Sequence, residues 1–303
     1  MADDNTAQGD ADEIAAVRQI WSALGLPGVI DVHTHFMPKS VLDKVWQYFD
    51  SGGPLVGRRW PITYRAEESR RLQMLRQFGV LGFTALVYPH KPQMAAWLNQ
   101  WSAQFARTNP DCLATATFYP EPDAGDYVEA AIRDGARVFK AHVQVGRYEP
   151  NDPLLDRVWG ILQDAALPIV IHCGSGPVPG EYTGPEPIHT LLRRFPRLRL
   201  IVAHLGMPEY AEFLDICENS AEVRLDTTMA FTPFTEAVMP FPPSQLARLR
   251  RLGHRILFGS DFPNIPHRYA DAMGVLTRLP GIDDDWLRAV FYHNAVALLD
   301  QRP

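Results

Sequence analysis

The 303-residue sequence contains only three cysteines, and no two of them have C-x-x-C spacing. Cys112, Cys173 and Cys217 are therefore expected to form neither a zinc knuckle nor a disulfide framework, which indicates a reducing, cytoplasmic location. No apolar run reaches the length of a membrane-spanning helix. The first thirteen residues contain five acids and no lysine or arginine, unlike a secretory signal, so no membrane partner is expected.

Basic residues are also scarce, with 29 Lys and Arg against 35 Asp and Glu, which gives a net charge of −6. This balance argues against nucleic acid as a partner, and the arginines within 193–199 and 248–255 are interpreted as solvated helix ends. No G-x-G-x-x-G or G-x-x-x-x-G-K-[ST] motif follows a predicted strand, which disfavours an open, doubly wound sheet. A small-molecule substrate is expected, together with a homodimer, because homodimers are the commonest soluble oligomers.

What the sequence does contain is an alternation of short apolar runs with amphipathic segments. Eight runs, rich in Val, Ile and Leu and bounded by Pro, Gly or Asp, are typical of parallel strands buried on both faces. After a first interval of 53 residues their starts are 23 to 33 residues apart, the spacing of β/α units. We therefore predict a (β/α)8 barrel over residues 28–303, with its chemistry at the C-terminal strand ends. The runs begin at Val29, Gly82, Leu113, Arg137, Pro168, Arg199, Glu222 and Arg255.

Three features flank or interrupt this alternation. Residues 1–27 are predicted to be a polar segment and a leading helix, whose apolar periodicity starts at Ile14. The long first interval predicts an insertion over the active face at residues 47–64, in the first βα loop. Within residues 92–107, apolar side chains including Trp97 recur at helical spacing and are expected to pack in the core.

Histidine or aspartate ends four of the predicted strands. His33 and His35 lie two residues apart after the first strand, so a pleated strand points both the same way. The fifth and sixth runs end in His172 and His204, and the eighth ends in Asp261. In a barrel these ends form a ring, and three imidazoles with a carboxylate suit a divalent ion such as zinc, which activates water at an open position. If His204 stands off the metal, it can bind the developing oxyanion, and Asp261 can accept a proton.

The D-V-H-T-H motif on the first strand, the histidines that close the fifth and sixth strands, and G-S-D on the eighth together resemble the amidohydrolase superfamily. They are most similar to its amidohydrolase-related branch, which includes relatives of aminocarboxymuconate semialdehyde decarboxylase. The resemblance extends from Val29 to Leu299, through a closing YHNAVALL segment. It implies a metal-dependent enzyme in which His204 positions water or substrate. The implied metal ligands are His33, His35, His172 and Asp261.

The fourth predicted strand carries a lysine whose role the sequence leaves open. Lys140, His142 and Gln144 share one face of this strand. In binuclear branches of the superfamily a carboxylated lysine here bridges two metals, and Lys140 could do so with His204 on the second ion. Alternatively, Lys140 remains an ammonium that binds a substrate carboxylate, or it pairs with Asp31. The resemblance to the one-metal branch favours a single divalent ion, with zinc as the expected metal.

Other side chains are candidates for substrate binding. Arg58 and Arg59, in the first loop, could clamp an anionic substrate, because arginine binds carboxylates through two hydrogen bonds. His142 on the fourth strand and His267, after the eighth, could line the pocket. Strand alternation turns Cys173 away from the metal. Surface or packing roles are assigned to His90, His189, His254 and His293.

These residues are compatible with three functions. The first is a metal-dependent hydrolase that acts on an ester, lactone or amide of a small organic substrate. The second is a non-oxidative decarboxylase that uses the same site, and the third is a metal-binding barrel without turnover. The two enzymes need the same ligands and differ in how the pocket orients the substrate.

Overall fold

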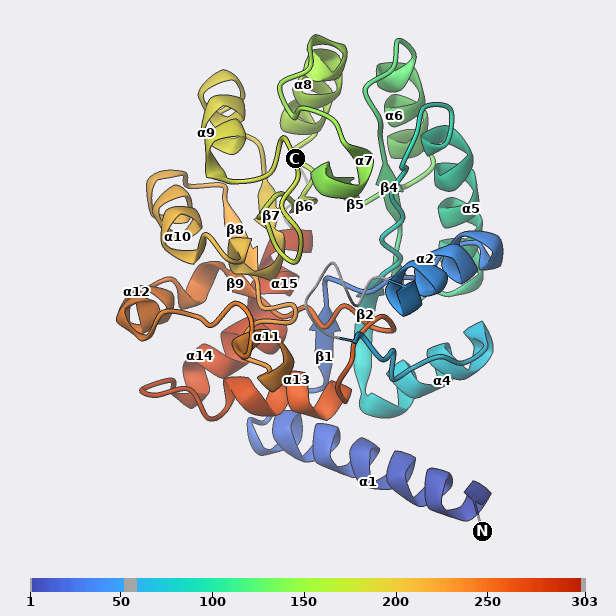
Figure 1. The fold of residues 1–303 in the computed structure, drawn as a ribbon, viewed down its shortest axis with the longest axis vertical. Helices are drawn as coiled ribbons and strands as arrows, with labels where there is room; N and C mark the ends of the chain where they lie inside the picture. The colour runs from blue at the N-terminus through green and yellow to red at the C-terminus, as the bar shows by residue number, and fades with distance from the viewer. Residues whose placement is uncertain (1, 52–58, 301–303) are drawn as a thin grey trace.

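A computed structural model describes residues 2–51 and 59–300 and contains a ring of parallel strands surrounded by helices (Figure 1). Each of the eight predicted apolar runs contributes strand structure. The third run is interrupted at Ala114 and forms two short strands. The strands are β1 Val29–Asp31, β2 Val80–Thr84, β3 Cys112–Leu113, β4 Thr115–Thr117, β5 Val138–His142, β6 Ile169–His172, β7 Leu200–Val202, β8 Arg224–Asp226 and β9 Ile256–Leu257.

The strands close into a barrel. All pairings are parallel, in the orders β1-β2-β3 and β4-β5-β6-β7-β8-β9, and β3 continues into β4 through a single residue. At the remaining joint, the Val32 N–H donates to the Phe258 carbonyl at 3.0 Å, and Thr34 pairs with Phe262 in a parallel bridge. The predicted (β/α)8 barrel is therefore confirmed, and the doubly wound alternative is wrong.

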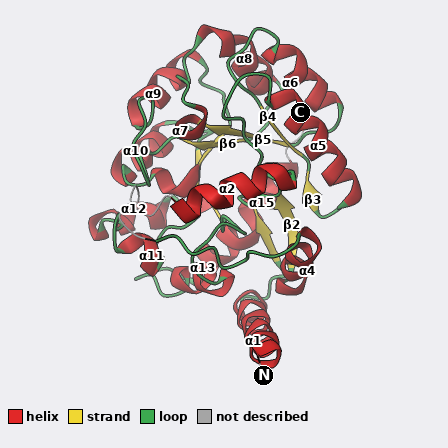
Figure 2. Cartoon of the chain, turned by 45° about the vertical axis from the view of Figure 1, so that its right-hand side comes forward, coloured by secondary structure: helices red, strands yellow, loops and turns green. Residues whose placement is uncertain are grey.

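Helices connect the strands and cover the barrel from outside (Figures 1 and 2). They are α1 Ala2–Ala23, α2 Lys39–Ser51, α4 Glu68–Phe78, α5 Ala95–Thr108, α6 Ala124–Arg133, α7 Val143–Gly146, α8 Asp156–Asp164, α9 Pro185–Arg194, α10 Tyr210–Asn219, α11 Pro233–Glu236, α12 Leu246–Arg251, α13 Tyr269–Leu276, α14 Asp284–Arg288 and α15 Asn294–Asp300.

Apolar side chains seal one end of the barrel. Strand residues that include Val138, Val170 and Ile201 form a buried cluster with Ala295 and Leu298 of the closing helix α15. Apolar side chains that alternate with these point outward to the surrounding helices, which is why the strand sequences are almost continuously apolar. The polar residues that follow the strands therefore gather at the opposite end, where the barrel is open.

The leading helix is longer than predicted. Helix α1 begins at Ala2, well before Ile14, and its side chain Val17 is fully buried. The reason is local, because the segment before Ile14 contains no proline and only one glycine and so nothing interrupts the helix. The helix packs against α4 and α13, outside the barrel.

The described parts of the long insertion in the first connection lie over the open end of the barrel, as predicted, although one of them is helical. The expected insertion at 47–64 begins inside α2, and residues 52–58, including Arg58, lie outside the described residues. Helix α2 crosses the barrel opening in Figure 2. Its side chains Lys44 and Tyr48 face the cavity described below.

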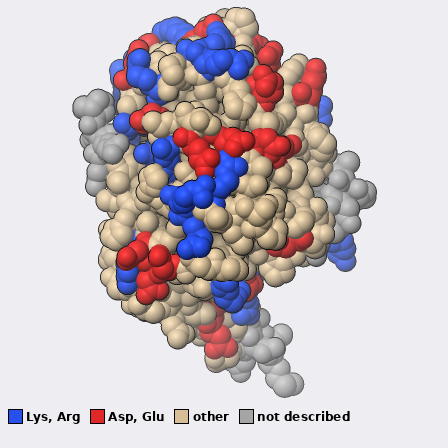
Figure 3. All heavy atoms as spheres, turned by 90° about the vertical axis from the view of Figure 1, so that its left-hand side faces the viewer, with Lys and Arg blue, Asp and Glu red and all other residues tan. Residues whose placement is uncertain are grey.

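Charged side chains on the flank of the barrel lie in mixed patches, as Figure 3 shows for one side. The two arginine clusters are at the ends of α9 and α12, as expected. Arg197 pairs with Asp164 at 2.8 Å, and Arg248 pairs with Glu218 at the same distance. Across residues 2–51 and 59–300, no helix combines the length and apolar character needed to span a bilayer.

Candidate metal centre

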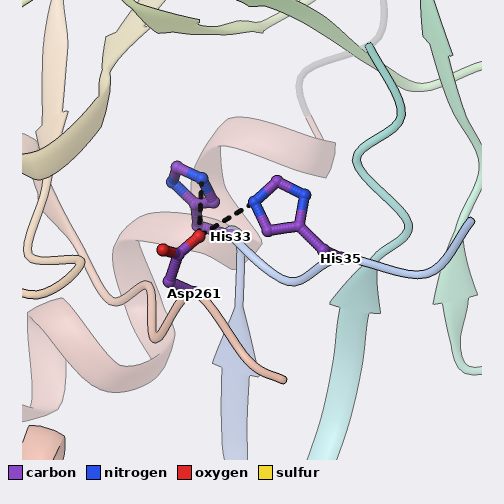
Figure 4. A group of neighbouring side chains, drawn as sticks. All are labelled: His33, His35 and Asp261. Carbon is purple, nitrogen blue, oxygen red and sulfur yellow. Dashed lines mark ion pairs between the residues drawn. The ribbon is translucent and has the colours of Figure 1, made fainter. Parts of the chain in front are cut away.

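Three of the predicted ligands converge at the open end of the barrel. Their ligand atoms, Nε2 of His33, Nε2 of His35 and Oδ1 of Asp261, lie within 4.8 Å of one another. The Asp261 oxygen is 3.6 Å from His33 Nε2 and 2.9 Å from His35 Nε2 (Figure 4). Two imidazole nitrogens and a carboxylate oxygen form a donor set that suits a divalent transition ion.

The backbone brings the first and last strands together at this point. The chain bends at Val32, directly after β1, and the Asp261 N–H donates to the His33 carbonyl at 2.8 Å. Gly259 of the G-S-D motif makes this approach possible, because a Cβ there would lie 2.7 Å from the His33 Cβ. The glycine therefore allows β9 to pass close enough for Asp261 to reach both histidines.

Hydrogen bonds hold both ligand imidazoles in the tautomer that a metal requires. His33 Nδ1–H donates to Asp226 at 2.8 Å, and His35 Nδ1–H donates to the Leu86 carbonyl at 2.8 Å. Each Nε2 atom consequently carries a lone pair toward the group. Burial, with the nearby Lys140 charge, lowers the pKa of His33 to about 3, so this imidazole is neutral at physiological pH. The residues present thus fit a bound divalent ion.

Asp226, at the end of β8, is a site residue that the sequence analysis missed. Its second oxygen, Oδ1, accepts the His204 N–H at 2.9 Å, so one carboxylate orients a ligand histidine and a second histidine. Burial opposes its ionisation, but the charge and hydrogen bond of His33 outweigh burial and lower the pKa of Asp226 to about 2. The signal was available, because Asp226 ends the seventh apolar run as Asp261 ends the eighth.

An Asp226→Asn substitution should weaken metal binding by about 10–100-fold, the usual effect of losing a carboxylate behind a ligand histidine. The amide presents either an oxygen or an NH2 group to His33 and so no longer fixes its tautomer. Isothermal titration with zinc would measure the change. Asp111→Asn, which breaks an ion pair with Arg76 elsewhere, is the matched control, and equal zinc affinity in the two variants would contradict this role.

The other predicted histidines surround the group. His172 Nε2 donates to the Gly176 carbonyl at 2.9 Å, and its ring stacks on His142 at 4.2 Å between centroids. The His204 ring lies 4.8 Å from that of His172 and 5.1 Å from that of His33, both measured between centroids. His172 is not part of the group of three converging ligand atoms, so its role as a fourth ligand stays a prediction.

His204 and Asp261 both adopt backbone conformations that are uncommon outside glycine. Their φ angles are 58° and 72°, in the left-handed region. Hydrogen bonds from their backbone N–H groups, to Asp226 and to the His33 carbonyl, hold them there. Such strain is frequent where a fold must aim a side chain at a functional site. Here it turns both side chains toward the metal group.

Lys140 extends from β5 into the centre of this site. Its side chain is fully buried, and Nζ lies 3.3 Å from His33 Nε2. Burial lowers its pKa to about 8, against the opposing effect of the negative charges of Asp226 and Asp261. The predicted alternative of a pair with Asp31 is wrong. Because the chain bends at Val32, Asp31 does not share a face with His33, and its carboxylate accepts the Tyr269 hydroxyl hydrogen bond at 2.9 Å.

A cavity of about 1100 Å³ opens above the metal group. Its floor is formed by the ligand group with Lys140, His142, His172 and His204. Its walls are largely apolar and include Tyr88, Met94 and Trp97, while the cations Lys44, Lys91 and Arg147 lie nearer the surface. The cavity can therefore hold a small organic molecule with an apolar body and negative charge.

Several expectations for cavity residues need correction. Trp97 lines the cavity and is 45% exposed, because it lies in the first turn of α5, directly after the loop that follows β2. His90 is exposed, which agrees with the surface role assigned to it, and it also lines the cavity. Arg59 is exposed, and neither it nor His267 is among the cavity-lining residues. Cys173 is fully buried and does not line the cavity, as predicted.

A closed (β/α)8 barrel whose polar side chains converge at the open, C-terminal end of its strands is the architecture of a barrel enzyme. A family model described as amidohydrolase matches residues 30–301. The chain therefore belongs to the amidohydrolase family, and the predicted resemblance to amidohydrolases is confirmed. The fold is one that enzymes of this family share.

Solved structures agree with this assignment at the level of the fold. An uncharacterized TIM-barrel protein from Bordetella bronchiseptica is 19% identical, with a TM-score of 0.71 over 90% of this chain and 99% of its own. A 5-carboxyvanillate decarboxylase from Novosphingobium aromaticivorans, complexed with manganese and 4-hydroxy-3-methoxy-5-nitrobenzoic acid, is 14% identical, with a TM-score of 0.61 over 91% and 97%. A candidate 2-pyrone-4,6-dicarboxylic acid hydrolase from Pseudomonas putida is 19% identical, with a TM-score of 0.60 over 90% and 97%. Among curated proteins, none matches the sequence.

Proposed function

We propose that this protein is a metal-dependent hydrolase that cleaves an ester, lactone or amide bond in a small anionic substrate. The observation that carries the proposal is the convergence of His33, His35 and Asp261 on the floor of a cavity that His204 also lines. His33, His35 and Asp261, with His172 as a fourth ligand, would hold one divalent ion, for which zinc suits the donor set. Such an ion would lower the pKa of water and polarise a substrate carbonyl.

The residues around the ligand group have complementary tasks in this proposal. His204 Nδ1–H donates to the Thr228 carbonyl at 3.2 Å, which leaves Nε2 to accept a proton or to bind the developing oxyanion. Asp261, ionised at neutral pH, is a second proton acceptor. Burial raises the pKa of Asp261, but the influence of the neighbouring His35, His33 and His204 outweighs burial and lowers it.

The buried Lys140 favours hydrolysis over decarboxylation. Its Nζ stands 3.3 Å from His33 Nε2, at the place where the reacting part of a substrate would lie. A cation there stabilises the oxyanion that forms as a carbonyl is attacked. It equally stabilises a substrate carboxylate in its ground state, which opposes the loss of carbon dioxide.

The cavity mouth points to the substrate class. The mouth is lined by three cationic side chains, Lys44, Lys91 and Arg147. The acidic side chain that lines the cavity near the surface is Glu181. Lys44 and Lys91 are close enough to His90 that, after burial, their positive charges lower the pKa of its imidazole. This arrangement suits a carboxylate on the distal part of the substrate, with its apolar body against Trp97 and Met94.

The alternative is a decarboxylase on the same residues. The likeness of the fold to the manganese-containing 5-carboxyvanillate decarboxylase supports it. A panel of lactones, esters, amides and aromatic acids, each with and without an extra carboxylate, separates the two. Hydrolysis of an ester or lactone consumes one base equivalent per turnover in a pH-stat, and hydrolysis of an amide releases a free amine; neither reaction releases carbon dioxide. Carbon dioxide release without consumption of water would contradict the hydrolase, and a metal-loaded protein inert to the whole panel would support a binding barrel.

Removal of the metal is the second part of this test. Elemental analysis is expected to find one divalent ion per chain, because the described ligands provide a single group of converging atoms. Dialysis against a chelator should abolish turnover, and zinc or manganese should restore it. Two ions per chain would instead indicate that Lys140 is carboxylated and bridges them, and full activity in the metal-free protein would contradict the proposal.

A further inference from the structure

Asp31 is a fully buried carboxylate beside the metal group that takes no part in the proposed reaction. It is not among the cavity-lining residues. One of its oxygens, Oδ1, accepts two backbone hydrogen bonds, from the N–H of His33 and from the N–H of Ser260, both at 3.1 Å. His33 is a ligand, and Ser260 directly precedes the ligand Asp261. A single oxygen atom therefore joins the two backbone segments that carry ligands from opposite ends of the chain.

The other oxygen of Asp31 is held from outside the barrel. Oδ2 accepts the hydroxyl hydrogen bond of Tyr269, the first residue of α13, at 2.9 Å. The Tyr269 N–H donates to the Tyr64 hydroxyl at 2.6 Å, and that hydroxyl donates to Glu13 of α1. Glu13 also accepts the Ala270 N–H at 3.3 Å. The leading helix, which precedes the family-matched residues 30–301, is thus connected to the ligand backbone by hydrogen bonds.

An ion pair does not account for the burial of this carboxylate. Within residues 2–51 and 59–300, no lysine or arginine forms a salt bridge with Asp31, and each of its hydrogen bonds goes to His33, Ser260 or Tyr269. A buried carboxylate is costly unless its hydrogen bonds are made, so the three residues are held closely to it. This arrangement is the kind of support that keeps metal ligands at fixed separations.

We propose that Asp31 is a positioning residue that sets the distance between His33 and Asp261, and that Tyr269 keeps Asp31 in place for this task. The inference rests on the proposed metal site. Through Tyr64 and Glu13, helix α1 contributes to the same support. Loss of the support should therefore change metal binding even though none of these side chains contacts the cavity.

Cobalt(II) is the probe for this inference, because its visible absorption bands report ligand geometry independently of turnover. A Tyr269→Phe variant loses the hydroxyl that holds Asp31. It should bind cobalt about tenfold more weakly, at the lower end of the effect of losing a group that supports metal ligands. Its absorption bands should also shift. Asp31→Ala should have a larger effect. Asp31→Asn keeps an oxygen that can accept both N–H groups, so it should recover part of the lost affinity.

The matched control is Tyr210→Phe, which removes another buried tyrosine hydroxyl, one that donates to the Met239 carbonyl at 2.9 Å. It should leave the cobalt affinity and spectrum unchanged, while thermal unfolding measures its structural cost. If Tyr269→Phe and Asp31→Asn lower stability but keep the wild-type cobalt affinity and spectrum, the inference is wrong and the proposed function stands. If the wild-type protein binds no cobalt, both are wrong.

Discussion

An Asp261→Asn variant is expected to bind zinc more than about 100-fold more weakly than the wild type and to lose activity. This loss of affinity is larger than the loss expected when a residue that only supports a ligand is replaced. The carboxylate is the single anionic donor in the group of three, and its Oδ1 lies 2.9 Å from His35 Nε2. An amide oxygen occupies the same space but carries no charge, so it is a much weaker ligand for a divalent ion. Titration with zinc and elemental analysis of the purified protein would measure the loss.

The matched control for this variant is Asp126→Asn. Asp126 is exposed and pairs with Arg157 at 2.6 Å on the outside of the barrel, so its neutralisation changes the net charge equally without touching the site. It should bind zinc like the wild type. Wild-type zinc affinity in Asp261→Asn would show that Asp261 is not a ligand, and the proposed metal centre would have to be abandoned.

The second large effect is expected for His204→Asn. Turnover should fall by about 10²–10⁴-fold, the usual contribution of a general acid or base, while zinc affinity stays close to the wild type. His204 is not one of the three converging ligand residues, but its ring lies 5.1 Å from that of His33 on the cavity floor. Asparagine is the suitable replacement because it tolerates the left-handed backbone, with φ of 58°, that this position requires.

A comparison of kcat with zinc content distinguishes the two roles that His204 could have. The control is His189→Asn, an exposed histidine on α9, which should change neither quantity. If His204→Asn loses its zinc together with its activity, His204 is a ligand, as in the two-metal alternative. If it retains full activity on a substrate that the wild type hydrolyses, the assignment of proton transfer to His204 is wrong.

Much of this site could be predicted from local sequence. A strand buried on both faces is almost continuously apolar, so a histidine or aspartate directly after such a run is conspicuous. His33, His35, His204 and Asp261 were found this way, and the structure places all four at the open end of the barrel. The even spacing of the runs predicted the barrel, because each β/α unit needs about the same length of chain.

Predictions failed where strict strand geometry was assumed beyond the end of a strand. Strand alternation predicted that Asp31 and His33 share one face. The chain bends at Val32, however, so the two side chains point in different directions. Trp97 was assigned to the core by helical spacing, although the first turn of α5 faces the cavity. In both cases the predicted periodicity was correct. Periodicity alone, however, does not determine in which direction a strand end or a helix points its side chains.

The amino-acid sequence by itself determined the barrel, the family and the identity of the converging His33, His35 and Asp261, since each depends on patterns within a few residues or on regular spacing. Only the tertiary structure decided what supports them. Asp226 is 193 residues from His33, and Ser260 is 229 residues from Asp31. The end of an apolar run marks Asp226 as a candidate, but nothing local indicates which residue either partner contacts. These hydrogen-bonded pairs form because closure of the barrel brings the residues after its first strand close to the ends of β8 and β9, where backbone N–H groups and buried carboxylates must find partners.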